Sequence, residues 1–299
     1  MINKINKKNL KIFIFFLFLI VNFQNNSFSN THVVEFDKWI INFKKTAVEK
    51  GISNETVNIA FKNVKFLDQV IKYDRKQPEF FEDTITYVTK RATTSRIKKA
   101  LKMLKENENL FNEIENKYNV EKEILLSLWA VETNFGKHVG KMDIISCLAT
   151  LSFDKRRSEF FSRQLLILLT LIDKKVIYPD ELFGSWAGAY GNFQFMPSTI
   201  SNYAIDYDKN GKIELKSSLP DSLASAANYI SKIGWKKGEP CFKKVKLTKE
   251  INVSNLNKSA RNIKNKKKIS TWIKKGVKNI NDTDLEGNYK SALITPDGY

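Results

Sequence analysis

A single glutamate, Glu132, has the sequence context of a general acid. Apolar residues recur three and four positions apart over residues 121–133, and Leu125, Leu128 and Glu132 fall at i, i+3 and i+7 of this helical pattern. A carboxyl group on an apolar face loses hydration, which raises its pKa toward neutrality. General acid catalysis near pH 7 needs such a pKa. The helix should end before Asn134, with the carboxyl at the rim of the core, although a buried Glu paired with a Lys or Arg would show the same pattern.

The glycine-rich segment from Gly184 to Thr199 combines aromatic and neutral polar side chains. Its glycines let backbone approach a ligand closely. Rings that offer apolar faces, interleaved with hydrogen-bonding groups, suit a sugar, whereas the absence of Lys and Arg argues against a phosphate cradle. The same stretch would also serve as an aromatic-rich turn before a helix. The residues concerned are Trp186, Tyr190, Phe193, Ser185, Asn192 and Gln194.

An acidic loop over residues 206–221 begins like a calcium-binding EF-hand loop. Oxygen-bearing side chains stand at positions 1, 3 and 5, and the turn glycine stands at position 6. Position 12 departs from the pattern, because Ser217 replaces the bidentate Glu, and Asp221 is the next carboxylate that follows. The spacing therefore allows either a calcium site or a solvated Asx turn. The matching residues are Asp206, Asp208, Asn210 and Gly211.

Helices are the elements that must position these groups. Apolar residues keep helical spacing over residues 84–106, 108–118 and 121–133, and Ser53, Thr94 and Asp221 are candidate N-caps. After Pro240 the sequence becomes lysine-rich, with short alternating runs at 245–247 and 250–253. The pattern predicts a mainly α fold with a small β or mixed subdomain near the C-terminus.

Composition excludes several classes of protein. With 42% hydrophobic and 12% aromatic residues in 299, the chain is a globular protein and not a disordered tail. Its two cysteines, Cys147 and Cys241, cannot make a disulfide framework and lack the spacing of a zinc or redox motif. The net charge of +18 fits an anionic partner or a lysine-rich genome equally well. The densest basic cluster reads most simply as a solvated face, and it comprises Lys264, Lys266, Lys267, Lys268, Lys274 and Lys275.

The first 29 residues read as a cleaved signal peptide. Four lysines precede an apolar run from Ile12 to Val21, which is shorter than the roughly 20 residues of a membrane-spanning helix. Small residues at Ser27 and Ser29 suit a signal peptidase, while an uncleaved membrane anchor is the alternative. No cysteine follows the run, so we expect a periplasmic protein without a lipid anchor. Removing the segment leaves a charge of 18 minus 4, or +14.

Taken in order, the motifs resemble the membrane-bound lytic transglycosylase B family, whose members cleave peptidoglycan in the periplasm. The similarity runs from about Gln77 to Trp235, and a weaker similarity continues through Trp272, Gly276 and Val277. It implies a lysozyme-like α-helical catalytic core at 30–240 and a small subdomain at 241–299 that is incomplete at its C-terminal end. The motifs are residues 129–136, 148–151, Asp154 with Arg156, Arg157, Phe160 and Phe161, 184–199, 206–221, and 227–229 with Gly234 and Trp235.

The resemblance also assigns roles to individual residues. Glu132 is implied as the catalytic acid and base. The implied glycan-contacting residues are Ser185, Gln194, Tyr87 and Tyr229. The implied ligands of a structural Ca²⁺ are Asp206, Asp208, Asn210, the carbonyl of Lys212, and Asp221 after a one-residue insertion. No organic cofactor is expected.

This family chemistry implies non-hydrolytic cleavage between N-acetylmuramic acid and N-acetylglucosamine, which gives 1,6-anhydromuramoyl ends. The expected partners are peptidoglycan glycan strands and other cell-wall enzymes. We expect a monomer that does not bind nucleic acid. The alternative is a non-catalytic peptidoglycan-binding or cell-wall scaffold protein that keeps the cleft without turnover.

Overall fold

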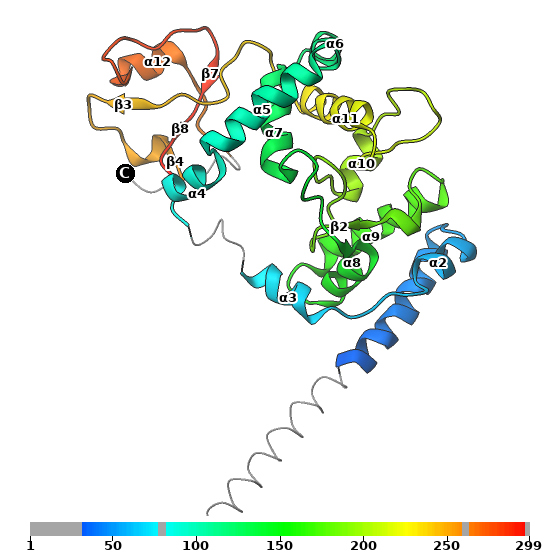
Figure 1. Ribbon diagram of the computed structural model, residues 1–299. Coiled ribbons are helices and arrows are strands. Elements are labelled where there is room, and N and C mark those ends of the chain that lie inside the picture. The colour runs from blue at the N-terminus through cyan, green and yellow to red at the C-terminus, as the bar shows by residue number, and fades with distance from the viewer. Residues whose placement is uncertain (1–31, 77–81, 259–262, 297–299) are drawn as a thin grey trace, which may run out of the picture. The chain divides into compact units, whose positions relative to one another are not determined.

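The computed structural model describes residues 32–76, 82–258 and 263–296, so the expected signal peptide at 1–29 lies outside the described residues (Figure 1). The chain divides into two compact units. The first comprises residues 1–76 and 128–229, and the second comprises 77–127 and 230–299. None of the described helices has the length and apolar character needed to cross a membrane. The domain boundary expected at residue 240 stays a prediction.

The first unit is built from helices around one buried helix, α8 (Ile144–Phe153). Every residue of α8 from Ile144 to Ser152 is buried, as expected for a helix that is apolar on all sides. It packs along α9 (Ser158–Asp173), as Figure 1 shows. The other elements are a helix at 32–49, α2 (Asn54–Ala60), α3 (Asp68–Arg75), the end of α7 (Lys122–Thr133), η2 (Pro179–Glu181), α10 (Pro197–Tyr203) and most of α11 (Leu219–Lys232).

A short antiparallel ladder joins two loops of the first unit. Strand β1 (Met142–Asp143) pairs with β2 (Phe183–Gly184), with Met142 opposite Gly184. Asp143 then caps α8, because its carboxylate accepts a hydrogen bond from the amide of Ser146 at 2.5 Å. The ladder fixes the segment that follows α7 against the start of the glycine-rich loop.

The second unit contains three helices, the start of α7 and the expected small mixed subdomain. The helices are α4 (Thr84–Arg91), α5 (Thr94–Glu106) and α6 (Glu108–Tyr118). In the subdomain, β3 (Val245–Leu247) pairs antiparallel with β6 (Val277–Asn279), β4 (Leu256–Asn257) pairs parallel with β8 (Leu293–Ile294), and β5 (Lys267–Lys268) pairs antiparallel with β7 (Lys290–Ser291). Helix α12 (Ile269–Lys274) places Trp272 in its core with Ile251, Val277 and Leu293. The run at 250–253 is not a strand, since Val253 begins the 3₁₀ helix η3 (Val253–Asn255).

Two of the three expected N-caps are wrong. Ser53 does cap α2, and its hydroxyl accepts a hydrogen bond from the amide of Thr56 at 3.2 Å. The run at 84–106 is broken at Ala92, and Thr93 caps α5 in place of Thr94 because its extended backbone directs the hydroxyl at Arg96. Asp221 lies inside the first turn of α11, where its carboxylate accepts hydrogen bonds from backbone amides of the acidic loop and caps no helix.

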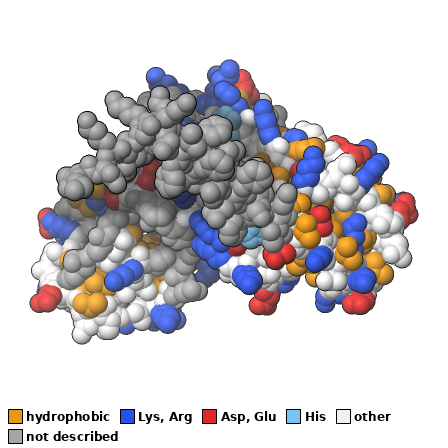
Figure 2. Space-filling view, turned by 90° about the horizontal axis from the view of Figure 1, so that it is seen from below, with side chains coloured by type: hydrophobic (Ala, Val, Ile, Leu, Met, Phe, Trp, Pro, Cys, Tyr) orange, Lys and Arg blue, Asp and Glu red, His pale blue; other side chains and the backbone are white. Residues whose placement is uncertain are grey.

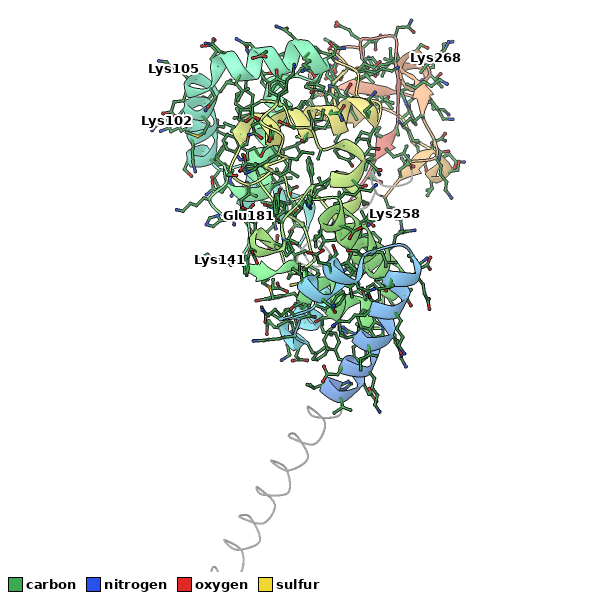
Figure 3. All side chains as sticks on the ribbon, turned by 90° about the vertical axis from the view of Figure 1, so that its right-hand side faces the viewer. Lys102, Lys105, Lys141, Glu181, Lys258 and Lys268 are labelled. Carbon is green, nitrogen blue, oxygen red and sulfur yellow. The ribbon has the colours of Figure 1, made fainter. Side chains whose placement is uncertain are left out.

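Four of the six lysines of the basic cluster have exposed side chains, namely Lys264, Lys266, Lys268 and Lys274, and Lys267 and Lys275 are half-buried. Within the described part of the chain, the six lysines of the basic cluster form no ion pair with an acidic residue. Lys102 and Lys105 of α5 and Lys268 of β5 lie at the outer edge of the second unit's ribbon in Figure 3. Lys, Arg, Asp and Glu side chains are interspersed over the described part of the face in Figure 2.

Candidate active site

Glu132 lies in the last turn of α7, at the point where one face of that helix passes from buried to open. Leu125 is fully buried, Leu128 is 37% exposed, and Glu132 is exposed. The carboxyl therefore sits at the rim, as the sequence predicts. Surrounding protein still removes part of its hydration, which raises its pKa above the ordinary value for Glu. Among the described residues, no ion pair or hydrogen bond reaches this carboxyl, so a structural Glu paired with a Lys or Arg is not what the geometry shows.

The chain leaves α7 through three consecutive residues in the left-handed region. Their φ angles are +51° at Asn134, +61° at Phe135 and +76° at Gly136. Such a conformation costs on the order of 1–3 kcal/mol at a non-glycine residue and persists only where neighbouring structure enforces it. Thr133 supplies part of that enforcement, because its hydroxyl accepts from the amide of Gly136 at 3.0 Å and its carbonyl accepts from the amide of His138 at 2.8 Å.

The glycine-rich loop is held by its own hydrogen bonds. The hydroxyl oxygen of Ser185 accepts from the amides of Ala187 at 3.3 Å and Ala189 at 3.0 Å. Gln194, at φ +50°, donates from Nε2 to the carbonyls of Val139 at 3.1 Å and Gly191 at 3.0 Å. These bonds orient both side chains. No described residue donates to Oε1 of Gln194 or accepts from the Ser185 hydroxyl, so both groups can bind a ligand.

Two of the three aromatic residues expected to face a sugar belong to the core. Tyr190 is 5% exposed and Phe193 is 7% exposed, and burial raises the pKa of Tyr190 to about 12. The expectation is wrong for these two. The backbone of Tyr190 pairs with that of Phe195, and the ring of Phe193 stacks on the ring of Phe195 at a centroid distance of 6.2 Å, so both side chains pack in the core. Trp186 remains partly exposed, with its ring centroid 6.4 Å from that of Tyr73.

The two predicted cleft tyrosines lie in different units. Tyr229 is half-buried on α11, where its ring meets those of Tyr203 and Phe195 at centroid distances of 5.1 and 6.1 Å. Tyr87 belongs to α4 of the second unit, and the guanidinium of Arg91 lies 3.4 Å above its ring. Their roles in glycan binding stay predictions.

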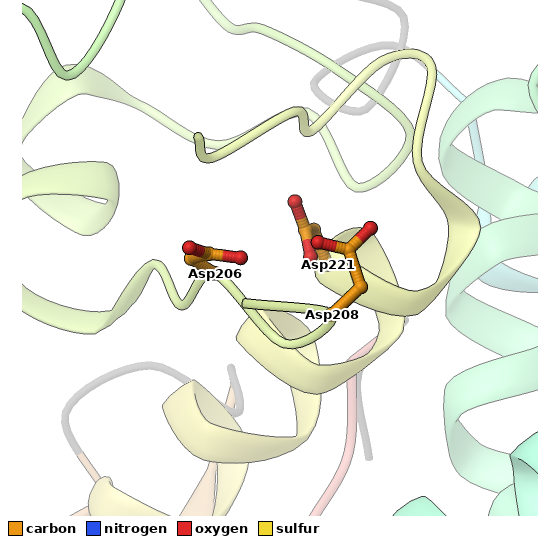
Figure 4. Close-up of side chains that lie close together, drawn as sticks. All are labelled: Asp206, Asp208 and Asp221. Atoms are coloured by element: carbon orange, nitrogen blue, oxygen red, sulfur yellow. The ribbon is translucent and has the colours of Figure 1, made fainter. Parts of the chain in front are cut away.

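The acidic loop brings Asp221 close to Asp206 and Asp208, which precede it by 15 and 13 residues. Oxygen atoms of Asp206, Asp208 and Asp221 lie within 4.8 Å of one another, and the side chains converge in Figure 4. Asp221 is fully buried and accepts from the amides of Tyr207 at 2.8 Å and Glu214 at 2.9 Å, so it joins the two ends of the loop.

This donor set fits a hard divalent cation. It consists of oxygen atoms alone, which Ca²⁺ prefers, and the turn glycine Gly211 has φ +88°. Three carboxylates at this separation repel one another, and none of the ion pairs in the described part of the chain neutralises them. A bound divalent cation would offset that repulsion.

Two residues at the site carry contacts that sequence reasoning did not assign to them. Thr133, which is 1% exposed, donates from its hydroxyl to the backbone carbonyl of Asn192 at 2.8 Å. Asn192 is 5% exposed, although the sequence suggested a sugar-binding amide there. The sequence offers one local signal of the role of Thr133, because it is a polar residue placed directly before Asn134 and Gly136, where its hydroxyl can cap the end of the helix.

A close backbone approach requires glycine at position 191. Gly191 has φ +76°, and a Cβ there would lie 2.4 Å from the carbonyl oxygen of Leu215. Gly191→Ala should therefore lose more than the roughly 1–2 kcal/mol of a left-handed alanine. Gly51→Ala is the matched control, because Gly51 has φ +90° and open space around it. Thermal unfolding of both variants checks this, and equal losses would show that the approach to Leu215 is not the constraint.

Comparison with known proteins gives matches to a protein family, to a curated protein and to solved structures. A family model described as "Transglycosylase SLT domain" matches residues 35–299. Membrane-bound lytic murein transglycosylase B of Escherichia coli (strain K12) is 36% identical over 156 residues, which cover 52% of this chain and 43% of that protein. The match thus spans less than half the length of this curated relative.

Solved structures of several lytic transglycosylases are similar in fold, and two of them are representative. SltB3 from Pseudomonas aeruginosa in complex with NAG-NAM-pentapeptide superposes with a TM-score of 0.80 at 31% identity, covering 88% of this chain and 70% of that one. The Escherichia coli lytic transglycosylase Slt35 in complex with calcium gives a TM-score of 0.71 at 28% identity, covering 85% and 79%.

Proposed function

This chain belongs to the transglycosylase SLT domain family, and from that premise we propose that it is a lytic transglycosylase that cleaves peptidoglycan. The substrate bond is the β-1,4 linkage between N-acetylmuramic acid and N-acetylglucosamine. The observation that carries the proposal is Glu132, a solvent-accessible carboxyl with a raised pKa and no charged partner among the described residues. That combination is typical of a general acid.

The reaction needs only one carboxyl group because the substrate supplies the nucleophile. Protonated Glu132 gives its proton to the glycosidic oxygen as that bond breaks, while the muramoyl 2-acetamido oxygen attacks the anomeric carbon. The resulting Glu132 carboxylate then takes the proton of the 6-hydroxyl of the same sugar. The 6-oxygen displaces the acetamido oxygen, which closes the 1,6-anhydro ring and restores the acid. Most glycosidases need a second carboxylate, whereas this route needs only one.

Four residues are proposed to bind the glycan strand. Ser185 offers a hydroxyl hydrogen and Gln194 offers Oε1, and both are held in place by backbone contacts within the loop. Tyr229 and Tyr87 offer phenol groups. A fixed sugar needs less ordering when it reacts, so these contacts lower the barrier through positioning. The complex of SltB3 with NAG-NAM-pentapeptide supports a glycan with a peptide stem as the ligand class.

The acidic loop is proposed to hold one structural Ca²⁺ through Asp206, Asp208, Asn210, the carbonyl of Lys212 and Asp221. The ion would supply positive charge that stabilises the loop. Slt35 in complex with calcium supports this choice of cation. Because the loop lies on other elements than Glu132, the proton transfers are assigned to the protein alone.

Residues 1–29 are proposed to direct export, after which the chain acts in the periplasm as a monomer. Its proposed partners are glycan strands and other cell-wall enzymes, and nucleic acid is not among them. This assignment follows from the signal-peptide pattern together with the peptidoglycan substrate.

Incubation with purified sacculi tests the proposed function. A lytic transglycosylase releases muropeptides with 1,6-anhydromuramoyl ends, which mass spectrometry distinguishes from the reducing ends made by a hydrolase. A protein that only co-sediments with sacculi and releases nothing would be the non-catalytic binder instead.

The pH dependence of turnover should report the environment of Glu132. The first step needs the protonated carboxyl, so the rate should fall as pH rises. Desolvation raises the Glu132 pKa, and the fall should therefore lie above the ordinary value of about 4.3. Initial rates on a defined glycan fragment between acid and neutral pH measure it. A descending limb centred at or below the ordinary value would contradict the assigned role.

A further inference from the structure

Asn192 is a buried side chain whose hydrogen-bonding groups are all in use. Its Oδ1 accepts from Nε1 of Trp129 at 3.0 Å, and its backbone carbonyl accepts from the Thr133 hydroxyl at 2.8 Å. Its Nδ2 donates to the carbonyl of Lys216 at 3.1 Å and to the hydroxyl of Ser222 at 3.1 Å. The backbone N–H of Asn192 donates to the carbonyl of Leu215 at 2.8 Å. The residue therefore bonds to two separate parts of the first unit.

The two bonds toward α7 bracket the acidic residue. Trp129 and Thr133 are four residues apart and thus lie one turn apart on the same face of the helix. Glu132 lies between them in sequence and faces outward. Holding both ends of this turn fixes where the carboxyl of Glu132 points.

The other bonds connect Asn192 to the buried start of α11 and to the chain directly before it. Ser222 is 1% exposed and lies next to the buried Asp221, at the start of α11. The Ser222 hydroxyl also donates to the carbonyl of Ser218, the residue directly before α11, at 2.7 Å. Asn192 consequently connects α7 with an element that the acidic loop already fixes.

We propose that Thr133 and Asn192 are positioning residues, which clamp the last turn of α7 so that Glu132 is held in the geometry that the reaction needs. The inference rests on the proposed function, because the orientation of Glu132 matters only if this residue acts as the catalytic acid. Two observations make the clamp necessary. No described residue bonds to the Glu132 carboxyl itself. The chain after α7 has a left-handed backbone, and it would relax from that conformation if the helix end loosened. A displacement of about 1 Å at a reacting group can cost roughly 100-fold in rate.

The matched variants Thr133→Val and Thr133→Ser test the clamp. Valine keeps the branched shape but leaves the Asn192 carbonyl and the Gly136 amide without the hydroxyl, whereas serine keeps the hydroxyl. Below the melting temperature, Thr133→Val should lower kcat about 10-fold to 100-fold with KM for a glycan fragment nearly unchanged. Thr133→Ser should recover most of that loss.

A second readout does not depend on turnover. NMR titration of the Glu132 carboxyl should show its pKa falling toward the ordinary Glu value in Thr133→Val, because a loosened turn admits water, and staying raised in Thr133→Ser. Should Thr133→Val fail to fold, Ser222→Ala replaces it, because it leaves the Thr133 hydroxyl in place and removes the hydroxyl that accepts from Nδ2 of Asn192 and donates to the Ser218 carbonyl. A smaller change in the same direction is expected.

The proposal is overturned if the folded Thr133→Val variant keeps the wild-type kcat and the wild-type Glu132 pKa while only its melting temperature drops. That result would make Thr133 a purely structural cap. If the wild type releases no product from sacculi, the proposed function fails, whereas the NMR comparison still decides whether the clamp holds the carboxyl.

Discussion

Glu132→Gln is expected to abolish glycan cleavage, with turnover falling about 10²-fold to 10⁴-fold, the usual contribution of general acid–base catalysis. The amide keeps the shape of the side chain but can neither give the proton to the glycosidic oxygen nor take it from the 6-hydroxyl. Because no described residue pairs with the carboxyl, folding and glycan binding should stay nearly intact. Release of anhydromuropeptides from sacculi and co-sedimentation with them measure the two properties separately.

Glu123→Gln provides the matched control, because Glu123 is an exposed glutamate in the first turn of the same helix. It should keep wild-type turnover. Retention of more than about a tenth of wild-type turnover by Glu132→Gln would remove Glu132 from the mechanism, since that loss is too small for the residue that moves both protons.

The same substitution has a stability consequence with a definite sign. Desolvation raises the Glu132 pKa in the folded chain, so the folded state keeps this proton to a higher pH than the unfolded chain does. The contribution of Glu132 to stability is then fully present below its unfolded pKa and is lost as pH rises through the folded value. Glu132→Gln does not titrate, so its melting temperature relative to wild type should rise from acid to neutral pH.

Removal of calcium is expected to lower the melting temperature without stopping catalysis at low temperature. An ion that binds only the folded state stabilises it by about 2.7 kcal/mol when free ion is 100 times its dissociation constant. The converging carboxylates of Asp206, Asp208 and Asp221 would lose that stabilisation and repel one another. Asp221 still ties the loop ends through two backbone amides, which keeps α11 in place when the solution is cool. Thermal unfolding with and without a chelator measures the effect.

The double variant Asp206→Ala with Asp208→Ala should melt at the same temperature with or without calcium. Asp37→Ala with Glu49→Ala removes two exposed acids of the helix at 32–49 and should retain the calcium response. If a chelator leaves wild-type melting unchanged, the loop is a plain Asx turn. If it stops turnover without destabilising the fold, the ion takes part in the reaction and the proposed mechanism is incomplete.

Local sequence determined the elements that carry the site. Helical spacing predicts a helix at 108–118 and another at 121–133, and the structure has Glu108–Tyr118 and Lys122–Thr133. The end of α7 just after Glu132 is also local, because the residues before Gly136 leave the helical conformation at once. Turn spacing likewise predicts the first half of the acidic loop, since its oxygen ligands lie within five residues of one another. Such features depend on neighbours in the chain and therefore follow from the sequence alone.

Tertiary structure decided the features that depend on residues distant in sequence. Position 12 of the loop offers no carboxylate, and it is the first turn of α11 that brings Asp221 to Asp206 and Asp208. The sequence suggests that Tyr190 and Phe193 are exposed aromatic residues for sugar binding, yet both are buried, Tyr190 paired through its backbone with Phe195 and Phe193 stacked on the Phe195 ring. The contact between Thr133 and Asn192 spans 59 residues. Desolvation of Glu132 also depends on how protein atoms pack around it, which helical spacing does not encode, because a period places a side chain on a face and says nothing about what covers that face.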